Sequence, residues 1–159
     1  MRLLIVPTLA LAAGALAIGS IVSAPAQGTG PLSADQIIAN RQAGQALMGA
    51  SFAEMKYSVD NKATDVKRYK PVADAMARWM SVFPDLFPSG TEQGHNTKAL
   101  PAIWSDRAGF DKDARAMTDE AKKLAQAADA NDPTAFATAF QNTGKACGAC
   151  HRTYRAKAS

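Results

Sequence analysis

The sequence predicts an all-α protein, folded as an antiparallel bundle of four helices. Three observations support this prediction: four segments carry apolar residues at helical spacing, residues typical of helix starts precede them, and no segment has the alternation of a strand. Amphipathic helices of this kind bury their apolar faces best against one another. Residues 27–159, about 130 residues, are enough for one domain with a single core.

Residues 1–26 have the pattern of a cleaved secretory signal peptide. A basic start at Arg2 is followed by a long apolar run and then by small residues up to Ala26. Cleavage after Ala26 fits best, and cleavage after Ala24 fits next best. The alternative is an uncleaved membrane anchor, since the apolar run approaches the length that spans a bilayer.

The first two helices are predicted between residues 33 and 88. The first begins at Ser33, whose capping box is completed by Gln36, and ends near Asn61. Its stripe recurs every three or four residues: Ile37, Arg41, Gly44, Met48, Phe52 and Met55. The second stripe ends where Pro84 and Pro88 break the pattern: Val72, Met76, Trp79 and Phe83. Residues 84–101 are rich in Pro, Gly, Ser, Thr and Asn and predict a long loop.

The last two helices have equally clear stripes. Ser105 is the predicted N-cap of the third, and Asp132 followed by Pro133 opens the fourth. The third stripe alternates four and three residues: Phe110, Ala114, Met117, Ala121, Leu124 and Ala128. The fourth includes both cysteines of the chain: Phe136, Phe140, Thr143, Cys147, Cys150 and Tyr154. The cysteines are therefore expected to face the interior.

The run CGACH at residues 147–151 has the C-x-x-C-H form of a covalent haem c attachment site. On a helix, Cys147, Cys150 and His151 project from one face, so one turn presents two thiols and an imidazole together. A redox dithiol, half of a zinc site or a structural disulfide are the alternatives. Zinc needs a fourth ligand, and the other histidine, His95, lies in a Gly/Pro/Ser-rich stretch that predicts a solvated loop. We therefore expect one haem c.

Charge and export indicate where the protein acts. The formal charge of +4 falls to +3 when Arg2 leaves with the signal peptide, and the basic residues are scattered without the dense clusters of a nucleic-acid surface. We expect no nucleic-acid binding and a surface charge that biases the choice of redox partner proteins. Bacterial haem c attachment takes place outside the cytoplasmic membrane, so the periplasm is the expected location.

The sequence resembles the cytochrome c′ family, the class II c-type cytochromes, whose haem motif lies near the C-terminus of a four-helix bundle. The resemblance rests on five stretches: residues 147–151, 154–155, 101–106 with Phe110, 41–43 and 90–92. It implies that Cys147 and Cys150 are the thioether attachments and that His151 is the proximal iron ligand. Members of the family are commonly homodimers built from the first two helices. In this chain Ile38 and Met80 are apolar residues outside the two core stripes, so they are compatible with contact to a second copy.

The resemblance also implies roles for four further residues. Arg155 matches an arginine beside the proximal histidine, Arg41 and Gln42 match residues near the haem propionates and edge, and Phe110 matches an aromatic residue of the haem pocket. Arg155 also suits the end of a helix, where a cation complements the helix dipole. Arg41 lies on an apolar stripe, where an unpaired charge is costly, so a propionate partner explains it better than solvation.

The residue four positions after Arg41 faces the distal side of the iron in the resembled family. High-spin members have a bulky apolar residue there and low-spin relatives have a ligating methionine, whereas this chain has Gln45. An amide is a poor ligand for haem iron but can donate a hydrogen bond. We therefore expect a five-coordinate iron with a polar distal pocket; Met48 and Met55 are rival ligands, although methionine is a common filler of bundle cores.

The expected function is single-electron transfer, binding of NO and CO, or both, by a haem protein that is not an enzyme. The alternative is a low-spin cytochrome with His and Met ligands that acts purely as an electron carrier. A peroxidase is disfavoured, since peroxide chemistry benefits from a distal acid or base and the first helix offers no histidine or well-placed carboxylate. Glu54 lies off the distal stripe.

Overall fold

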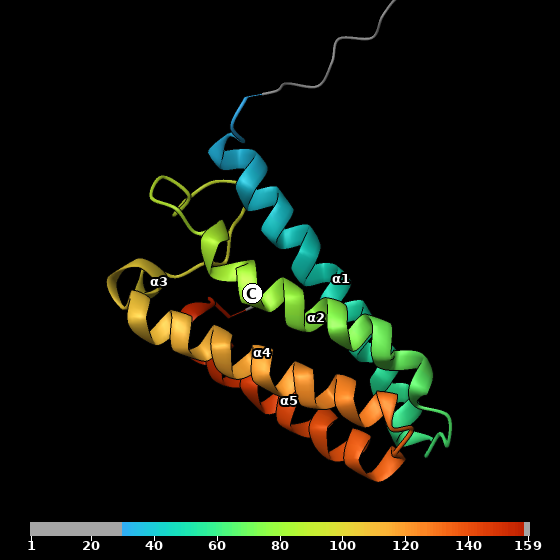
Figure 1. The fold of residues 1–159 in the computed structure, drawn as a ribbon. Coiled ribbons are helices and arrows are strands. Elements are labelled where there is room, and N and C mark those ends of the chain that lie inside the picture. Colours follow the sequence, from blue (N-terminus) through green and yellow to red (C-terminus); the bar gives the residue numbers. More distant parts are fainter. Residues whose placement is uncertain (1–29, 158–159) are drawn as a thin grey trace, which may run out of the picture. The chain divides into compact units, whose positions relative to one another are not determined.

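Helices account for nearly all the regular structure of residues 30–157, the part of the chain that the computed structural model describes (Figure 1). The five α-helices are α1 (Ala34–Asp60), α2 (Lys70–Val82), α3 (Ala102–Ser105), α4 (Arg107–Asp129) and α5 (Pro133–Tyr154). Two 3₁₀ turns, η1 (Lys67–Tyr69) and η2 (Phe83–Leu86), flank α2. The four long helices confirm the predicted bundle; α3 is a single added turn. The predicted signal peptide, residues 1–26, lies outside the described residues.

Capping residues fix where three of the long helices begin. Ser33 Oγ accepts from the Gln36 backbone N–H at 3.2 Å, and Gln36 Oε1 accepts from the Ser33 N–H at 2.9 Å, which confirms the capping box of α1. Asp132 caps α5 as predicted. The prediction for Ser105 is wrong: Asp106 caps α4 through the Gly109 N–H, and Ser105 is the last residue of α3. The chain makes an extra turn at α3, which moves the start of α4 beyond Ser105.

The core lies mainly where α4 packs against α2 on one side and α5 on the other (Figure 1). All six residues of the predicted third stripe are buried in α4. Helix α1 approaches α2 closely at Gly44, where a Cβ atom would lie 2.1 Å from the Trp79 ring. Any larger residue at this crossing would force the Trp79 ring to move. No helix within residues 30–157 is long and apolar enough to span a membrane.

The loop between η2 and α3 is held in place by the buried side chain of Arg41. The guanidinium donates to the Leu86 and Thr91 carbonyl oxygens at 3.1 and 2.8 Å and to the Thr91 and Thr97 hydroxyls at 3.0 Å each. It also lies 4.2 Å from the centre of the Phe87 ring. One side chain of α1 thus fixes a segment that carries little regular structure of its own.

The C-terminal end of α5 is tied to both neighbouring segments. The Tyr154 hydroxyl donates to Asp106 Oδ2 at 2.7 Å, so α5 is linked to the residue that caps α4. The Leu100 N–H donates to the Tyr154 carbonyl at 3.0 Å, and the Ala156 N–H donates to the Lys98 carbonyl at 2.8 Å. These bonds bring residues 98–100 alongside the last turn of α5.

Substitution Arg41→Lys is expected to destabilise the haem-loaded protein by about 3 kcal/mol, because an ammonium cannot reproduce the four hydrogen bonds of the guanidinium, two of which are fully buried. Urea unfolding monitored by circular dichroism measures this loss. The exposed Arg115 on α4 provides the control, and Arg115→Lys should change the free energy of unfolding by less than about 0.5 kcal/mol. Equal stability of the two variants would show that Arg41 does not hold the loop.

Stability is also expected to depend on Tyr154 at alkaline pH. The hydrogen bond to Asp106, with burial, raises the pKa of Tyr154 from 10.0 to about 12, so folding favours the neutral phenol. This contribution is complete below pH 10 and is lost as the pH rises towards 12. The difference in unfolding free energy between wild type and Tyr154→Phe, about 1.5 kcal/mol near neutral pH, should shrink over that range. Tyr57→Phe, at an exposed tyrosine, should show no such trend.

Candidate haem site

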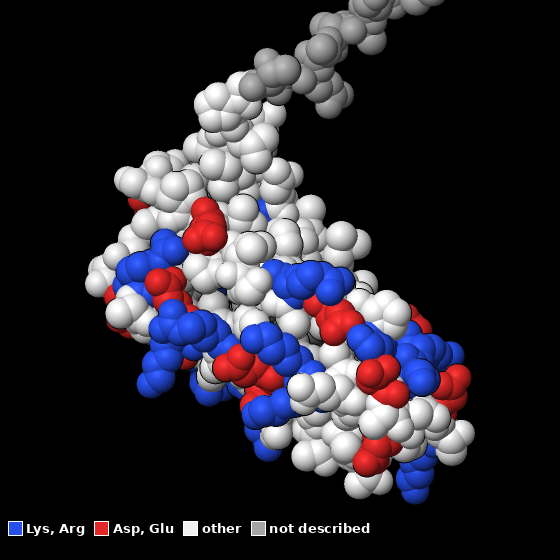
Figure 2. Space-filling model, in the orientation of Figure 1, with Lys and Arg blue, Asp and Glu red and all other residues white. Residues whose placement is uncertain are grey.

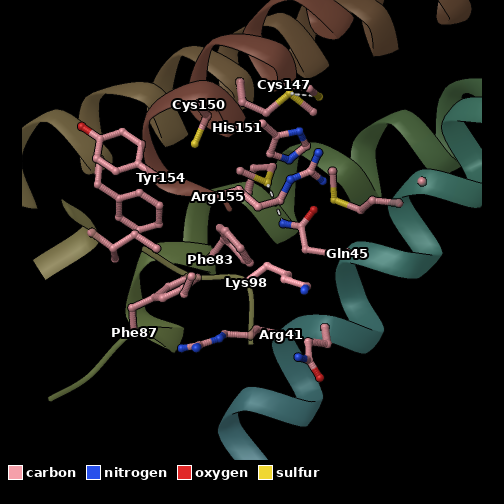
Figure 3. A pocket seen from close by; sticks show the side chains of 18 of the residues that line it. Arg41, Gln45, Phe83, Phe87, Lys98, Cys147, Cys150, His151, Tyr154 and Arg155 are labelled. Carbon is pink, nitrogen blue, oxygen red and sulfur yellow. Dashed lines mark hydrogen bonds between the residues drawn. The ribbon is translucent and has the colours of Figure 1, made fainter. Parts of the chain in front are cut away.

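A cavity of about 450 Å³ lies among α1, α2, α4 and the last turns of α5, with residues 97–99 along its rim (Figure 3). It brings together every residue that the sequence analysis assigned to a cofactor site: Arg41, Gln42, Gln45, Phe110, Cys147, Cys150, His151 and Arg155. Most of its remaining lining is apolar or contains sulfur. The site is therefore built from segments more than 100 residues apart in the sequence.

The wall formed by α5 carries the C-x-x-C-H motif. Cys147, Cys150 and His151 all line the cavity, and both cysteines are free thiols (Figure 3). Burial raises the pKa of Cys147, and it raises the pKa of Cys150 to about 11, so both remain protonated at neutral pH. Burial and the nearby Arg155 lower the pKa of His151. The imidazole is thus kept neutral, the form that can bind a metal.

The wall formed by α1 carries Gln45, Met48 and Phe52. Gln45 points into the cavity from the opposite side to the motif, and its Nε2 lies 4.0 Å from the Met80 sulfur, a weak acceptor (Figure 3). Met48 lines the cavity, whereas Met55 is completely buried in the core and does not. Of the two rival ligands, only Met48 therefore reaches the site.

Arg41 and Gln42 line the cavity, but their hydrogen bonds go to the loop. Gln42 is exposed and its Nε2 donates to the His95 carbonyl at 3.0 Å. Four of the five N–H donors of Arg41 are used by loop oxygens, which leaves the Nε–H for another acceptor. Burial lowers the pKa of Arg41, and no carboxylate forms a salt bridge with it within residues 30–157. A positive charge is thus buried at the cavity edge without a salt bridge from the described chain, although the negative charge of Glu92 partly offsets the effect of burial on its pKa.

Aromatic side chains form the end of the cavity next to Tyr154. Phe110 is buried and makes edge contacts with Phe87 and Tyr154, at ring-centre distances of 5.0 and 5.2 Å. Phe110 therefore belongs both to the core and to the site. The sequence analysis did not anticipate Lys98 or Met80 in the lining. Lys98 lies in a loop without periodicity, so no sequence signal could have placed it.

The residues present fit a covalently attached haem. Two free thiols and a neutral imidazole from one helical turn face an apolar cavity, whose edge holds one buried cation that suits a propionate. A zinc site fits less well, since the described residues contain no group of three or more His, Cys, Asp or Glu side chains placed to hold a metal ion. His95 lies outside the cavity, with its Nε2 3.6 Å from Asp35 Oδ1.

Comparison with known proteins agrees with this fit. The sequence pattern of the family "Cytochrome C'" matches residues 36–155. Cytochrome c′ of Alcaligenes xylosoxydans xylosoxydans is 37% identical over 119 residues, which cover 74% of this chain and 91% of the relative. Cytochrome c′ of Allochromatium vinosum is 33% identical over 151 residues, covering 92% and 95% of the two chains.

A solved structure shows the same fold with a gas bound. The nitric oxide complex of a variant of cytochrome c prime from Alcaligenes xylosoxidans is 32% identical in sequence, with a TM-score of 0.73, and covers 81% of this chain and all of that one. The family pattern spans the bundle and the C-x-x-C-H motif together. This chain belongs to the cytochrome c′ family and carries one haem c, bound covalently through Cys147 and Cys150.

Proposed function

We propose that this protein is a periplasmic cytochrome c′ whose iron has His151 as its one protein ligand and an open sixth position, and that it transfers single electrons, binds NO and CO, or does both. The observation that carries the proposal is Gln45 on the α1 wall, opposite the motif, where an amide replaces the ligating methionine of low-spin relatives. The nitric oxide complex of a relative supports gas binding. The signal-like residues 1–26 support export.

The residues of the site have separate tasks in this proposal. Cys147 and Cys150 hold the porphyrin, and the neutral His151 is ready to bind the iron. Bound haem supplies an iron that changes its charge by one electron and can accept a diatomic ligand. Gln45 Nε2, engaged only with a weak sulfur acceptor, is free to donate a hydrogen bond to such a ligand. Arg41 offers its buried charge and remaining Nε–H to a propionate.

A bis-ligated electron carrier is the second candidate, and a specific observation favours it. The cavity is lined by Met48 and also by three methionines of α2 and α4: Met76, Met80 and Met117. A thioether that reached the iron would fill the sixth position and prevent gas binding. The Met117 sulfur already contacts Cys147 Sγ at 3.5 Å, which leaves Met48, Met76 and Met80 as the rivals.

The proposed role is not enzymatic. Peroxide chemistry benefits from an acid or base beside the open iron position. The cavity lining within the described chain contains no Asp or Glu and no histidine other than His151, and Glu54 lies outside it. Rapid peroxide turnover by the purified protein would contradict this part of the proposal.

A homodimer through α1 and α2 is proposed on the exposed apolar side chains of these helices. Leu47, Tyr57 and Val82 are 71%, 69% and 50% exposed. Ile38 and Met80, which the sequence analysis offered as contacts, are buried within the chain and are not available. The exposed residues are therefore the better candidates for an interface between two copies.

The optical spectrum of the purified protein tests the iron coordination. We expect a high-spin spectrum that shifts when CO is added to the reduced protein. Gln45→Leu should raise the C–O stretching frequency, because a hydrogen bond to the bound gas is lost, while Met48→Leu should leave the spectrum unchanged. A low-spin spectrum indifferent to CO that becomes high-spin in Met48→Leu would establish the bis-ligated carrier instead.

Sedimentation velocity of the haem-loaded protein tests the dimer. Leu47→Lys should shift it from dimer to monomer, since a charge would be buried against the partner's apolar surface. The matched control is Ala116→Lys on an exposed position of α4, which should remain dimeric. A wild type that sediments as a monomer at all concentrations would contradict the proposed interface.

A further inference from the structure

A second hollow lies between α5 and α1, beside the haem cavity, with which it shares Phe52. Its volume is about 570 Å³, and its apolar floor is made by Phe52 and Phe140, whose rings stack at a centre-to-centre distance of 4.1 Å. Gly144 leaves the floor open, since a Cβ there would lie 3.3 Å from Phe52 Cζ. This α1/α5 groove, lined also by Lys56, Lys145 and Arg152, is accessible from the surface.

The charged side chains that line the groove are all basic. Lys56, Lys145 and Arg152 are exposed, and no Asp or Glu is among the lining residues of the described chain. Lys56 pairs with Asp60, but neither Lys145 nor Arg152 forms a salt bridge within residues 30–157. The haem cavity adds three more basic residues and no acidic one: Arg41, Lys98 and Arg155.

The surface of α2 and α4 has a different character. In Figure 2, blue and red side chains lie next to one another on this face. Four ion pairs within single helices account for much of this mixture: Lys70–Asp74, Arg107–Asp111, Lys122–Asp119 and Lys123–Glu120. Much of the positive charge on α2 and α4 is thus paired within the same helix, although Arg78, Lys112 and Arg115 form no salt bridge with any described residue. The groove is lined by basic side chains without an acidic one among its described residues, so it can attract an acidic surface.

The groove also lies next to the attached cofactor. Phe52 lines both the groove and the haem cavity. Gly148, in the groove wall, stands between the two attachment cysteines, and Arg152 directly follows His151. A protein seated in the groove would therefore be separated from the haem site by one aromatic side chain and one turn of helix.

From these observations we propose that the α1/α5 groove is the docking surface for an acidic electron-transfer protein, whose carboxylates pair with Lys145 and Arg152 and whose apolar contact covers Phe52 and Phe140. One electron passes between the haem and the redox centre of the partner, so that one is oxidised as the other is reduced and no bond is made or broken. This inference rests on the proposed electron-transfer function.

The test uses an acidic plant-type [2Fe–2S] ferredoxin, photochemically reduced, as the electron donor to the haem-loaded protein. Stopped-flow absorbance gives the second-order rate constant for haem reduction at several ionic strengths. The double variant Lys145→Glu/Arg152→Glu is expected to react at least about tenfold more slowly than wild type at low salt, with the difference disappearing at high salt. The control Lys122→Glu/Lys123→Glu carries the same change in net charge on α4 and should keep most of the wild-type rate.

Two further measurements, oxidation by a neutral quinone and sedimentation velocity, separate the outcomes. Oxidation of the ferrous protein by neutral 1,4-benzoquinone should proceed equally in all variants, which shows that the haem site is intact. If ferredoxin reduces both double variants at one rate while benzoquinone still oxidises them, the docking proposal is overturned and electron transfer stands. If the wild-type haem exchanges electrons with neither reagent, the proposed function fails. If the groove variant changes the sedimentation behaviour but not the rate of haem reduction, the groove is an interface between two copies of this protein. That result also overturns the proposal.

Discussion

The structure depends on the register of one helix, α5. The same face of α5 that buries Phe136 and Thr143 in the core continues into Cys147, Cys150 and His151, which line the cavity. Because residues three and four apart share a face of a helix, packing the first half of α5 aims the motif in the second half. Asp132 sets where this helix begins and the Tyr154–Asp106 bond holds where it ends. The orientation of the attachment site is thus a consequence of core packing.

Arg41 has a comparable effect on the opposite side of the cavity. Its guanidinium organises the loop after η2 with four hydrogen bonds and lies against the Phe87 ring. Burying a charge without an ionic partner is unfavourable, and the lowered pKa of Arg41 reflects this cost. A haem propionate close to Arg41 would offset the cost and would couple loop order to cofactor binding through one side chain. The residue is therefore better described as a clamp for the loop than as a propionate ligand alone.

The surface charges also differ between α4 and the region around the motif. On α4, Lys122 and Lys123 are each paired with a carboxylate one turn away, which reduces the net charge of that part of the surface. Around the motif lie Lys145 and Arg152 on α5 and Arg155 just after it, and neither hollow has an acidic residue in its described lining. A modest overall charge is thus concentrated where electrons would enter or leave the protein.

The sequence alone predicts the helical class, the four stripes, the capping box of α1, the cap of α5 and the haem attachment motif, because periodicity, caps and C-x-x-C-H are local patterns in which neighbouring residues carry the information. It misplaced the cap of α4 at Ser105, since the extra turn of α3 has no periodic signal. Three features come from the fold alone: Met55 lies in the core, Met80 and Lys98 line the cavity, and Arg41 bonds to the loop. These features depend on contacts between residues far apart in the chain. Such contacts are specified by side-chain packing in the folded protein and not by local sequence patterns.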